Sequence, residues 1–138
     1  MAAELVLVVE DNPMNVQLVR AVLCRSGYRV AVARSLREAR LFLGSERPDL
    51  VLLDIGLPDG DGLELMDVLR ERGIPALAVS AFAMAEDRRR AFAAGCAGYL
   101  TKPLNTRAFA SQVAHALAVR EGPEGGGGAD ASRPPRGR

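Results

Sequence analysis

The chain contains 138 residues, of which 49% are hydrophobic and 25% are charged, and its formal net charge is +1. This length suits one domain with a single core, and the near-neutral charge gives no electrostatic case for binding nucleic acid. The apolar runs are far shorter than the ~20 residues of a membrane-spanning helix, and residues 1 to 15 lack a signal-peptide pattern. We therefore expect a soluble, cytoplasmic protein without a membrane partner.

Strand and helix signals alternate through the first 120 residues of the chain. Five short apolar runs have the length of buried strands, and a segment with apolar residues at helical spacing follows each of them. The five runs are Leu5–Val9, Tyr28–Val32, Leu50–Leu53, Ala76–Val79 and Gly98–Leu100. Repeated strand and helix units predict an α/β fold, in which a doubly wound, five-stranded parallel sheet has helices on both faces. We place this domain at residues 1–120.

Capping residues mark several of the expected helix starts. Asn12 followed by Pro13 is typical of an N-cap and a first helical position. Ser35 and Glu38 have the spacing of a capping box, in which each side chain bonds the backbone N–H of the other residue. Asn105 predicts the start of the last helix, which we expect to end near residue 120. The caps agree with the apolar periodicity, so two independent signals support these helices.

Two segments of the chain carry neither a strand nor a helix signal. Residues 55–62 form a loop rich in glycine and proline, in which Asp59 and Asp61 are interpreted as turn residues. Residues 121–138 contain Gly125–Gly128 and no large apolar side chain, so packing cannot offset the entropy of ordering them. We therefore expect a disordered Gly/Pro-rich tail or linker at residues 121–138.

Polar and charged residues stand where the predicted strands end. They are Glu10 and Asp11 after the first run, Asp54 after the third, Ser80 after the fourth and Lys102 shortly after the fifth. Because the carboxyl ends of parallel strands share one edge of the sheet, these side chains are expected to converge there. Three carboxylates that meet repel one another, and a hard cation such as Mg²⁺ relieves the repulsion. The sequence therefore predicts a magnesium site and chemistry on phosphate.

The strand-end residues suit the transfer of a phosphoryl group to a carboxylate. Asp54 is the candidate nucleophile, and its reaction would yield an aspartyl phosphate. Asp11 is predicted to ligate Mg²⁺ directly and Glu10 through water, while the backbone carbonyl of Gly56 supplies a further oxygen. Lys102 brings the opposing positive charge to the site.

Other polar residues near the strand ends and on the helices are interpreted one by one. The hydroxyl of Ser80 can donate to a phosphoryl oxygen, so it could sense whether the acceptor is modified. Pro103 raises the prospect of a cis peptide bond after Lys102. His115 lies among alanines without an acidic neighbour, which indicates a helix-surface histidine, and Arg88–Arg90 indicate a solvated helix face.

Four motifs of the chain resemble the receiver domain of two-component response regulators. The similarity covers residues 4 to 120, and the motifs keep the order and approximate spacing of that family. They are Val8–Asn12, Leu53–Pro58 with Gly62, Ser80–Ala81 and Tyr99–Pro103. The resemblance implies a flavodoxin-like (βα)5 receiver fold with strand order 2-1-3-4-5.

The resemblance also implies a function, that of a phosphorylation-activated signalling switch and not of a separate enzyme. A histidine kinase or histidine phosphotransfer protein would pass a phosphoryl group to Asp54 in a Mg²⁺-dependent reaction, and slow self-catalysed hydrolysis would remove it. Ser80 and Tyr99 would be the switch residues, and the bond between Lys102 and Pro103 would be cis. A downstream protein would bind the face formed by the fourth helix, fifth strand and fifth helix. A monomer or weak dimer is expected.

Several alternatives remain open at this point. Residues 12–15 and 81–84 are most similar to stand-alone regulators of the DivK type and to receivers of hybrid histidine kinases. The enzyme alternative is an aspartate-nucleophile phosphohydrolase of the haloacid-dehalogenase type, which needs a second acid two residues after its nucleophile, and residues 10–12 lack this pattern. A pseudoreceiver, which binds partners without being phosphorylated, normally lacks an acid, the acceptor aspartate or the lysine, and all of these are present.

Overall fold

The computed structural model describes residues 3–81 and 85–120, so the expected tail at residues 121–138 lies outside the described residues. Strands and helices alternate along the chain as the periodicity predicted. They are β1 (Leu5–Val9), α1 (Pro13–Arg25), β2 (Arg29–Ala33), α2 (Leu36–Ser45), β3 (Leu50–Asp54), β4 (Gly56–Leu57), β5 (Gly60–Asp61), the 3-10 helix η1 (Gly62–Leu65), α3 (Met66–Glu71), β6 (Ala76–Ser80), α4 (Ala85–Ala93), β7 (Gly98–Thr101) and α5 (Thr106–Arg120). Among these described helices, none has the length and apolar character needed to cross a membrane.

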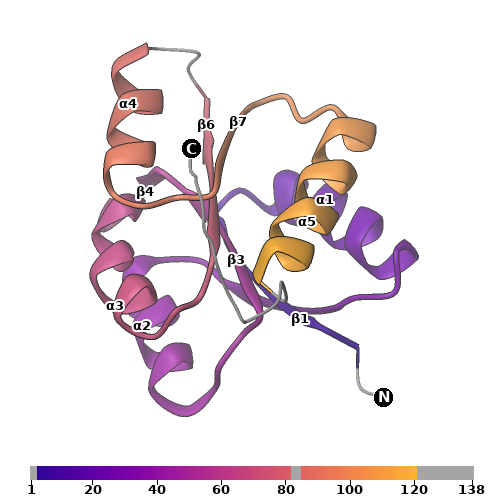
Figure 1. The fold of residues 1–138 in the computed structure, drawn as a ribbon, viewed down its shortest axis with the longest axis horizontal. Helices are drawn as coiled ribbons and strands as arrows, with labels where there is room; N and C mark the ends of the chain where they lie inside the picture. Colours follow the sequence, from indigo (N-terminus) through magenta and orange to yellow (C-terminus); the bar gives the residue numbers. More distant parts are fainter. Residues whose placement is uncertain (1–2, 82–84, 121–138) are drawn as a thin grey trace.

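Five of the strands form one sheet in the order β2-β1-β3-β6-β7 (Figure 1). All four pairings in this sheet are parallel. Since β6 and β7 are the fourth and fifth predicted strands, the predicted order 2-1-3-4-5 is confirmed. One boundary differs, because β2 begins at Arg29 and not at Tyr28. The backbone N–H of Tyr28 donates to the carbonyl of Leu23 at 3.0 Å, which ties it to the end of α1.

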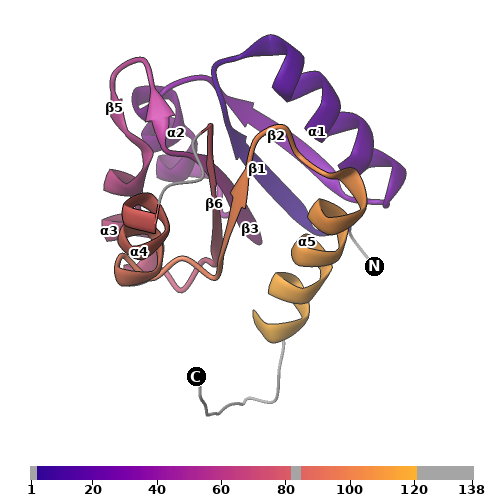
Figure 2. The ribbon, with the colours of Figure 1, turned by 90° about the horizontal axis from the view of Figure 1, so that it is seen from above.

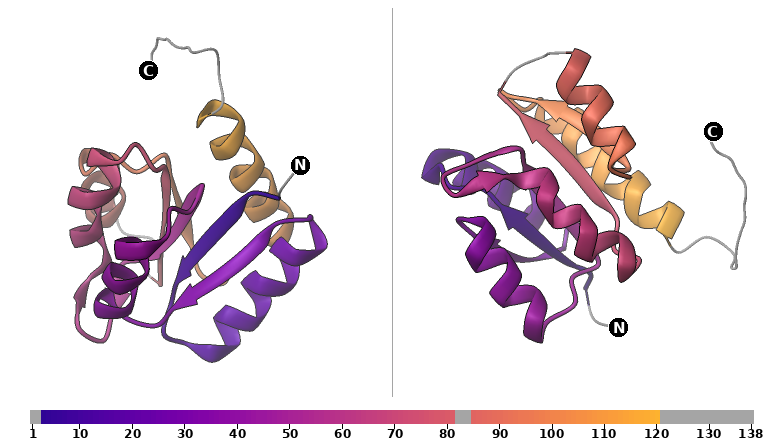
Figure 3. Two further views of the ribbon diagram at one scale, coloured as in Figure 1. Left: turned by 90° about the horizontal axis from the view of Figure 1, so that it is seen from below. Right: turned by 90° about the vertical axis from the view of Figure 1, so that its left-hand side faces the viewer.

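Helices cover both faces of the sheet (Figure 2). α1 and α5 lie on one face, and α2, α3 and α4 lie on the other, which the right-hand view of Figure 3 shows from outside. Successive strand residues point to opposite faces, so Val6 and Val8 of β1 pack with α1 and α5, while Leu7 and Val9 pack with the other three helices. Two apolar cores thus hold the sheet, and its carboxyl edge is left for polar residues.

The helix starts follow the predicted caps with one difference. The side chain of Asn12 accepts hydrogen bonds from two backbone N–H groups in the first turn of α1. Ser35 accepts from the backbone N–H of Glu38 at 3.1 Å, as a capping box requires. The carboxylate of Glu38, however, accepts from the N–H of Arg34 at 2.8 Å and not from that of Ser35. The reciprocal half of the predicted box is therefore displaced by one residue.

The glycine-rich segment after β3 contains a small hairpin that the sequence pattern did not predict. β4 and β5 pair antiparallel, and Asp59 lies between them. Asp59 lies in the turn between the two strands, as predicted, and its carboxylate also accepts from the N–H groups of Leu36 and Arg37 at 2.9 and 3.1 Å, which the sequence did not predict. These hydrogen bonds, chiefly the one from Leu36, hold the pKa of Asp59 below its usual value. Asp59 therefore joins the hairpin beside β3 to the start of α2.

Candidate functional site

The carboxyl edge of the sheet contains a polar cavity of about 630 Å³. The ends of β1, β3 and β6 and the segment after β7 contribute to its walls. Its lining includes every strand-end residue that the sequence predicted to converge: Glu10, Asp11, Asp54, Ser80 and Lys102. Gly56, the predicted donor of a backbone oxygen, lines the same cavity. The topology of a parallel sheet thus brings together residues as far apart in the chain as Glu10 and Lys102.

Three carboxylates meet in this cavity. One oxygen from each of Glu10, Asp11 and Asp54 lies within 4.8 Å of the other two. Glu10 and Asp54 are buried, with 5% and 4% of their surface exposed, whereas Asp11 is exposed. The N–H of Asn12 donates to Glu10 Oε2 and the N–H of Gly56 donates to Asp54 Oδ1, both at 3.1 Å, which fixes the two buried carboxylates. This set of oxygen donors suits a hard divalent cation such as Mg²⁺.

Lys102 is the cation that faces the carboxylates. Its Nζ lies 3.0 Å from Asp54 Oδ2 and 3.0 Å from Glu10 Oε1. The backbone N–H of Lys102 donates to the carbonyl of Ser80 at 2.8 Å, and the bond from Lys102 to Pro103 is cis. Burial acts to lower the pKa of Lys102, but hydrogen bonds to Asp54 and Glu10 outweigh burial and raise this pKa above its usual value. The ammonium group therefore stays charged beside the carboxylates.

The ionised form of Asp54 is disfavoured even with Lys102 beside it. Burial, and to a smaller extent the negative charge of Glu10, raises the pKa of Asp54. Lys102 lowers it, but the first two effects are larger, and the pKa rises to about 6. The cluster also places three carboxylates beside the one ammonium group of Lys102, so it holds more negative charge than that group neutralises. This excess, together with the oxygen donors, shows that the residues fit a divalent cation.

Ser80 and Tyr99 lie on the adjacent strands β6 and β7. Ser80 ends β6, is buried, and its hydroxyl donates to Asp87 Oδ2 of α4 at 3.4 Å. Tyr99 is half-buried and packs against the apolar core beneath α2, α3 and α4. Both predicted switch residues thus belong to the side of the sheet that α4 covers.

Comparison with known proteins agrees with this geometry, since residues 6–114 match the response regulator receiver domain. The chain belongs to the response regulator receiver domain family. The polar-differentiation response regulator DivK of Brucella anthropi is 39% identical over 112 residues, which cover 78% of this receiver and 91% of that protein.

Solved structures confirm the fold of the receiver. A CheY-like response regulator receiver domain protein from Methanospirillum hungatei JF-1 matches with a TM-score of 0.82 at 27% identity, over 91% of this chain and 100% of that one. The receiver domain of a sensor histidine kinase from Pseudomonas aeruginosa PAO1 matches with a TM-score of 0.76 at 30% identity, over 85% and 99% of the two chains. That structure is described with a magnesium ion coordinated in the active site cleft.

The receiver also has an ionic cluster beside the site that the sequence did not predict. Asp87 lines the cavity that contains Asp54, and Arg90 Nη1 lies 3.4 Å from Asp87 Oδ1. The other terminal nitrogen of Arg90 pairs with Asp61 Oδ2 at the start of η1. Arg90 therefore does not belong to a simply solvated helix face. The spacing of three residues between Asp87 and Arg90 could have indicated their contact, but no sequence signal connects Arg90 to Asp61.

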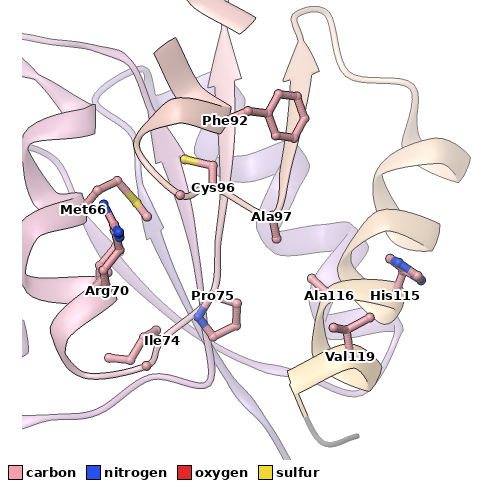
Figure 4. A pocket seen from close by; sticks show the side chains of 13 residues that line it. Met66, Arg70, Ile74, Pro75, Phe92, Cys96, Ala97, His115, Ala116 and Val119 are labelled. Carbon is pink, nitrogen blue, oxygen red and sulfur yellow. The ribbon is translucent and has the colours of Figure 1, made fainter. Parts of the chain in front are cut away.

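A larger cavity of the receiver, of about 860 Å³, lies at the opposite edge of the sheet (Figure 4). Pro75 and Ala97, which directly precede β6 and β7, line it together with Phe92 of α4 and Val119 of α5. His115 also lines it and is exposed, as expected of a helix-surface histidine. The described residues of this lining include no carboxylate, so the cavity offers no counterpart to the carboxylate cluster.

Proposed function

We propose that this receiver is a phosphorylation-activated switch in which Asp54 accepts a phosphoryl group from a phosphohistidine. The donor would be a histidine kinase or a histidine phosphotransfer protein. The observation that carries the proposal is the placement of the Asp54 carboxylate, 3.0 Å from the ammonium group of Lys102 and within 4.8 Å of two further carboxylates. Phosphoryl transfer to a carboxylate requires a nucleophile, a positively charged side chain and a group of carboxylates that can bind a metal ion, and this cavity contains all three.

The residues that would hold Mg²⁺ follow from the donor set of the cavity. Asp11 and Asp54 would be direct ligands, Glu10 would act through water, and the backbone carbonyl of Gly56 would add an oxygen. When bound, the ion neutralises charge on the phosphoryl oxygens. The structure of the histidine kinase receiver with magnesium in its cleft supports this proposal by similarity.

The chain's own residues account for the remaining chemistry. A lone pair of the Asp54 carboxylate would form the new O–P bond while the P–N bond of phosphohistidine breaks, and the imidazole nitrogen would keep that electron pair and take a proton from solvent. With a pKa of about 6, Asp54 is mostly ionised at neutral pH and so can act as the nucleophile. Lys102 would hold a phosphoryl oxygen by charge and hydrogen bonding. Hydrolysis by water would later restore the carboxylate.

The signal would pass from the acceptor to the surface through Ser80 and Tyr99. The phosphoryl group would draw the hydroxyl of Ser80 inward, and the ring of Tyr99 would turn into the space that becomes free. Because Tyr99 lies on the edge strand β7 beside α4, its movement would reshape the face formed by α4, β7 and α5. A downstream protein that binds this face would then distinguish the two states.

Intact-mass measurement after incubation with acetyl phosphate and Mg²⁺ tests the proposal. We expect the native chain to gain the mass of one phosphoryl group, and Asp54→Asn or added EDTA to abolish that gain. Asp67→Asn is a suitable control, because Asp67 is exposed on α3, pairs with Arg40, accepts from the N–H of Val68 and does not line the cavity that contains Asp54. A phosphoryl adduct on Asp54→Asn would identify a different acceptor, and the lack of any Mg²⁺-dependent adduct on the native chain would refute the switch.

A further inference from the structure

The hydroxyl of Ser80 is engaged by a carboxylate that belongs to neither the acceptor nor the predicted metal ligands. Ser80 Oγ donates to Asp87 Oδ2 at 3.4 Å. Asp87 lies in the first turn of α4, and its side chain is 20% exposed and lines the cavity that contains Asp54. A hydroxyl has a single proton. Donation to Asp87 and donation to a phosphoryl oxygen on Asp54 therefore exclude each other.

Ionic contacts hold Asp87 in its place. Its second oxygen, Oδ1, lies 3.4 Å from Arg90 Nη1, one turn further along α4. Arg90 in turn pairs with Asp61, whose other oxygen accepts from the N–H of Leu63 at 2.8 Å. Asp87 is thus connected through Arg90 to the start of η1, which follows the acceptor strand β3 in the chain after the short hairpin of β4 and β5. A carboxylate restrained in this way loses little side-chain entropy when it accepts from Ser80.

We infer that Asp87 is a positioning residue that competes with the phosphoryl group for the hydroxyl proton of Ser80, and so sets the balance between the two states of the receiver. This inference rests on the proposed function of Asp54 as phosphoryl acceptor. In the unphosphorylated state, the hydrogen bond from Ser80 to Asp87 connects the end of β6 to α4. When Ser80 turns to the phosphoryl group, that connection breaks, while Asp87 keeps its contact with Arg90. The first turn of α4 then loses a hydrogen bond to the sheet. Loss of this bond would transmit the phosphorylation of Asp54 to the partner-binding face, of which α4 is a part.

Neutralising Asp87 is therefore expected to favour the activated state. An amide oxygen accepts more weakly than a carboxylate, so Asp87→Asn should release Ser80 more easily. We expect Asp87→Asn to bind beryllofluoride, a mimic of the phosphoryl group, about threefold to tenfold more tightly than the native chain in the presence of Mg²⁺, the range that a partly exposed hydrogen bond to a charged group supports.

A double-mutant cycle separates competition for Ser80 from a simple effect of charge. Beryllofluoride affinity is measured by NMR titration in Mg²⁺ for the native chain, Asp87→Asn, Ser80→Ala and the double variant. If Asp87 acts through the hydroxyl, Asp87→Asn raises the affinity only when Ser80 is present. An equal gain in the Ser80→Ala background would mean that the variant merely removes repulsion, and would overturn the inference.

A control variant and the native chain complete the experiment. Glu86→Gln removes a neighbouring charge of the same helix, at an exposed residue that pairs with Arg89, and should leave the affinity within about twofold of the native value, as expected for a surface charge. Failure of the native chain to bind beryllofluoride would refute the proposed function itself. Native binding with no gain from Asp87→Asn would refute only the role of Asp87.

Discussion

Replacing Lys102 by methionine is expected to lower the free energy of unfolding by about 2 to 3 kcal/mol near neutral pH without Mg²⁺, because two buried carboxylates lose their cation. The ammonium group lies 3.0 Å from both Asp54 and Glu10, and the side chain of Lys102 is only 18% exposed. Methionine keeps most of the aliphatic part of the lysine side chain. The expected loss of stability therefore comes mainly from the missing charge and its hydrogen bonds and less from changed packing. Proton uptake by Asp54, whose pKa is already about 6, limits the cost.

The sign of the pH dependence follows from the raised pKa of Asp54. Its folded-state pKa of about 6 lies above the ~3.9 of an unfolded chain, so the folded state binds more protons between these values and becomes more stable as the pH falls. Removing the ammonium group raises the folded-state pKa further. The unfolded-state pKa is the same for both chains, so the cost of Lys102→Met is fully present above the raised folded-state pKa of the variant and fades as the pH falls to the native folded-state value of about 6.

Urea unfolding near pH 7 and near pH 5 measures this difference. Arg40→Met is the control, since it breaks an ion pair with Asp67 in which both side chains are largely exposed, and it should change stability by less than about 0.5 kcal/mol at either pH. Added Mg²⁺ should restore part of the stability of Lys102→Met, because a divalent ion replaces the missing positive charge. A loss that is the same at both pH values would instead assign the effect to packing of the lysine stem.

The arrangement of the carboxylate cluster could be predicted because it depends on only two rules. Buried parallel strands appear as short apolar runs, and their carboxyl ends share one edge. The residues that directly follow those runs, such as Glu10 and Asp54, are therefore brought together whatever the detailed packing. The cis bond at Pro103 is different, because the family resemblance and not the strand pattern implied it.

The contacts that the sequence did not predict depend on the path of a loop or the rotation of a helix. Asp59 caps α2 from a position 23 residues away, through a hairpin that is only two residues long on each side. Arg90 reaches Asp61 only because α4 presents this side chain toward η1. Periodicity places a helix on a face of the sheet but does not fix its rotation or height. Polar contacts between such elements are therefore settled by packing and not by a local pattern.

Replacing Gly62 by alanine is expected to damage the site by steric collision, although no charged group changes. Gly62 is buried and its N–H donates to the carbonyl of Ile55 at 2.8 Å. A Cβ atom added there would collide with the carbonyl oxygen of Asp54 and would lie 3.3 Å from the Cα of Ile55. Backbone atoms cannot move aside as a flexible side chain can, so the loop or the end of β3 must shift. We expect a loss of about 2 to 3 kcal/mol in stability, toward the upper end of overpacking effects.

The collision partner is the backbone of Asp54, the proposed acceptor, so the consequence extends to cation binding. A shift of the Asp54 carbonyl moves its carboxylate relative to Glu10 and Asp11, and small misplacements of reacting groups are costly. Mg²⁺ titration of Gly62→Ala should show at least about tenfold weaker binding, because the ligands are no longer held in one geometry.

Gly44→Ala is the matched control: Gly44 lies in α2 with no neighbour within 4 Å of an added Cβ atom. That control should gain about 0.5 to 1 kcal/mol from helix propensity and keep its Mg²⁺ affinity. Unchanged Mg²⁺ affinity in Gly62→Ala would mean that the loop after β3 absorbs the displacement and that β3 does not move.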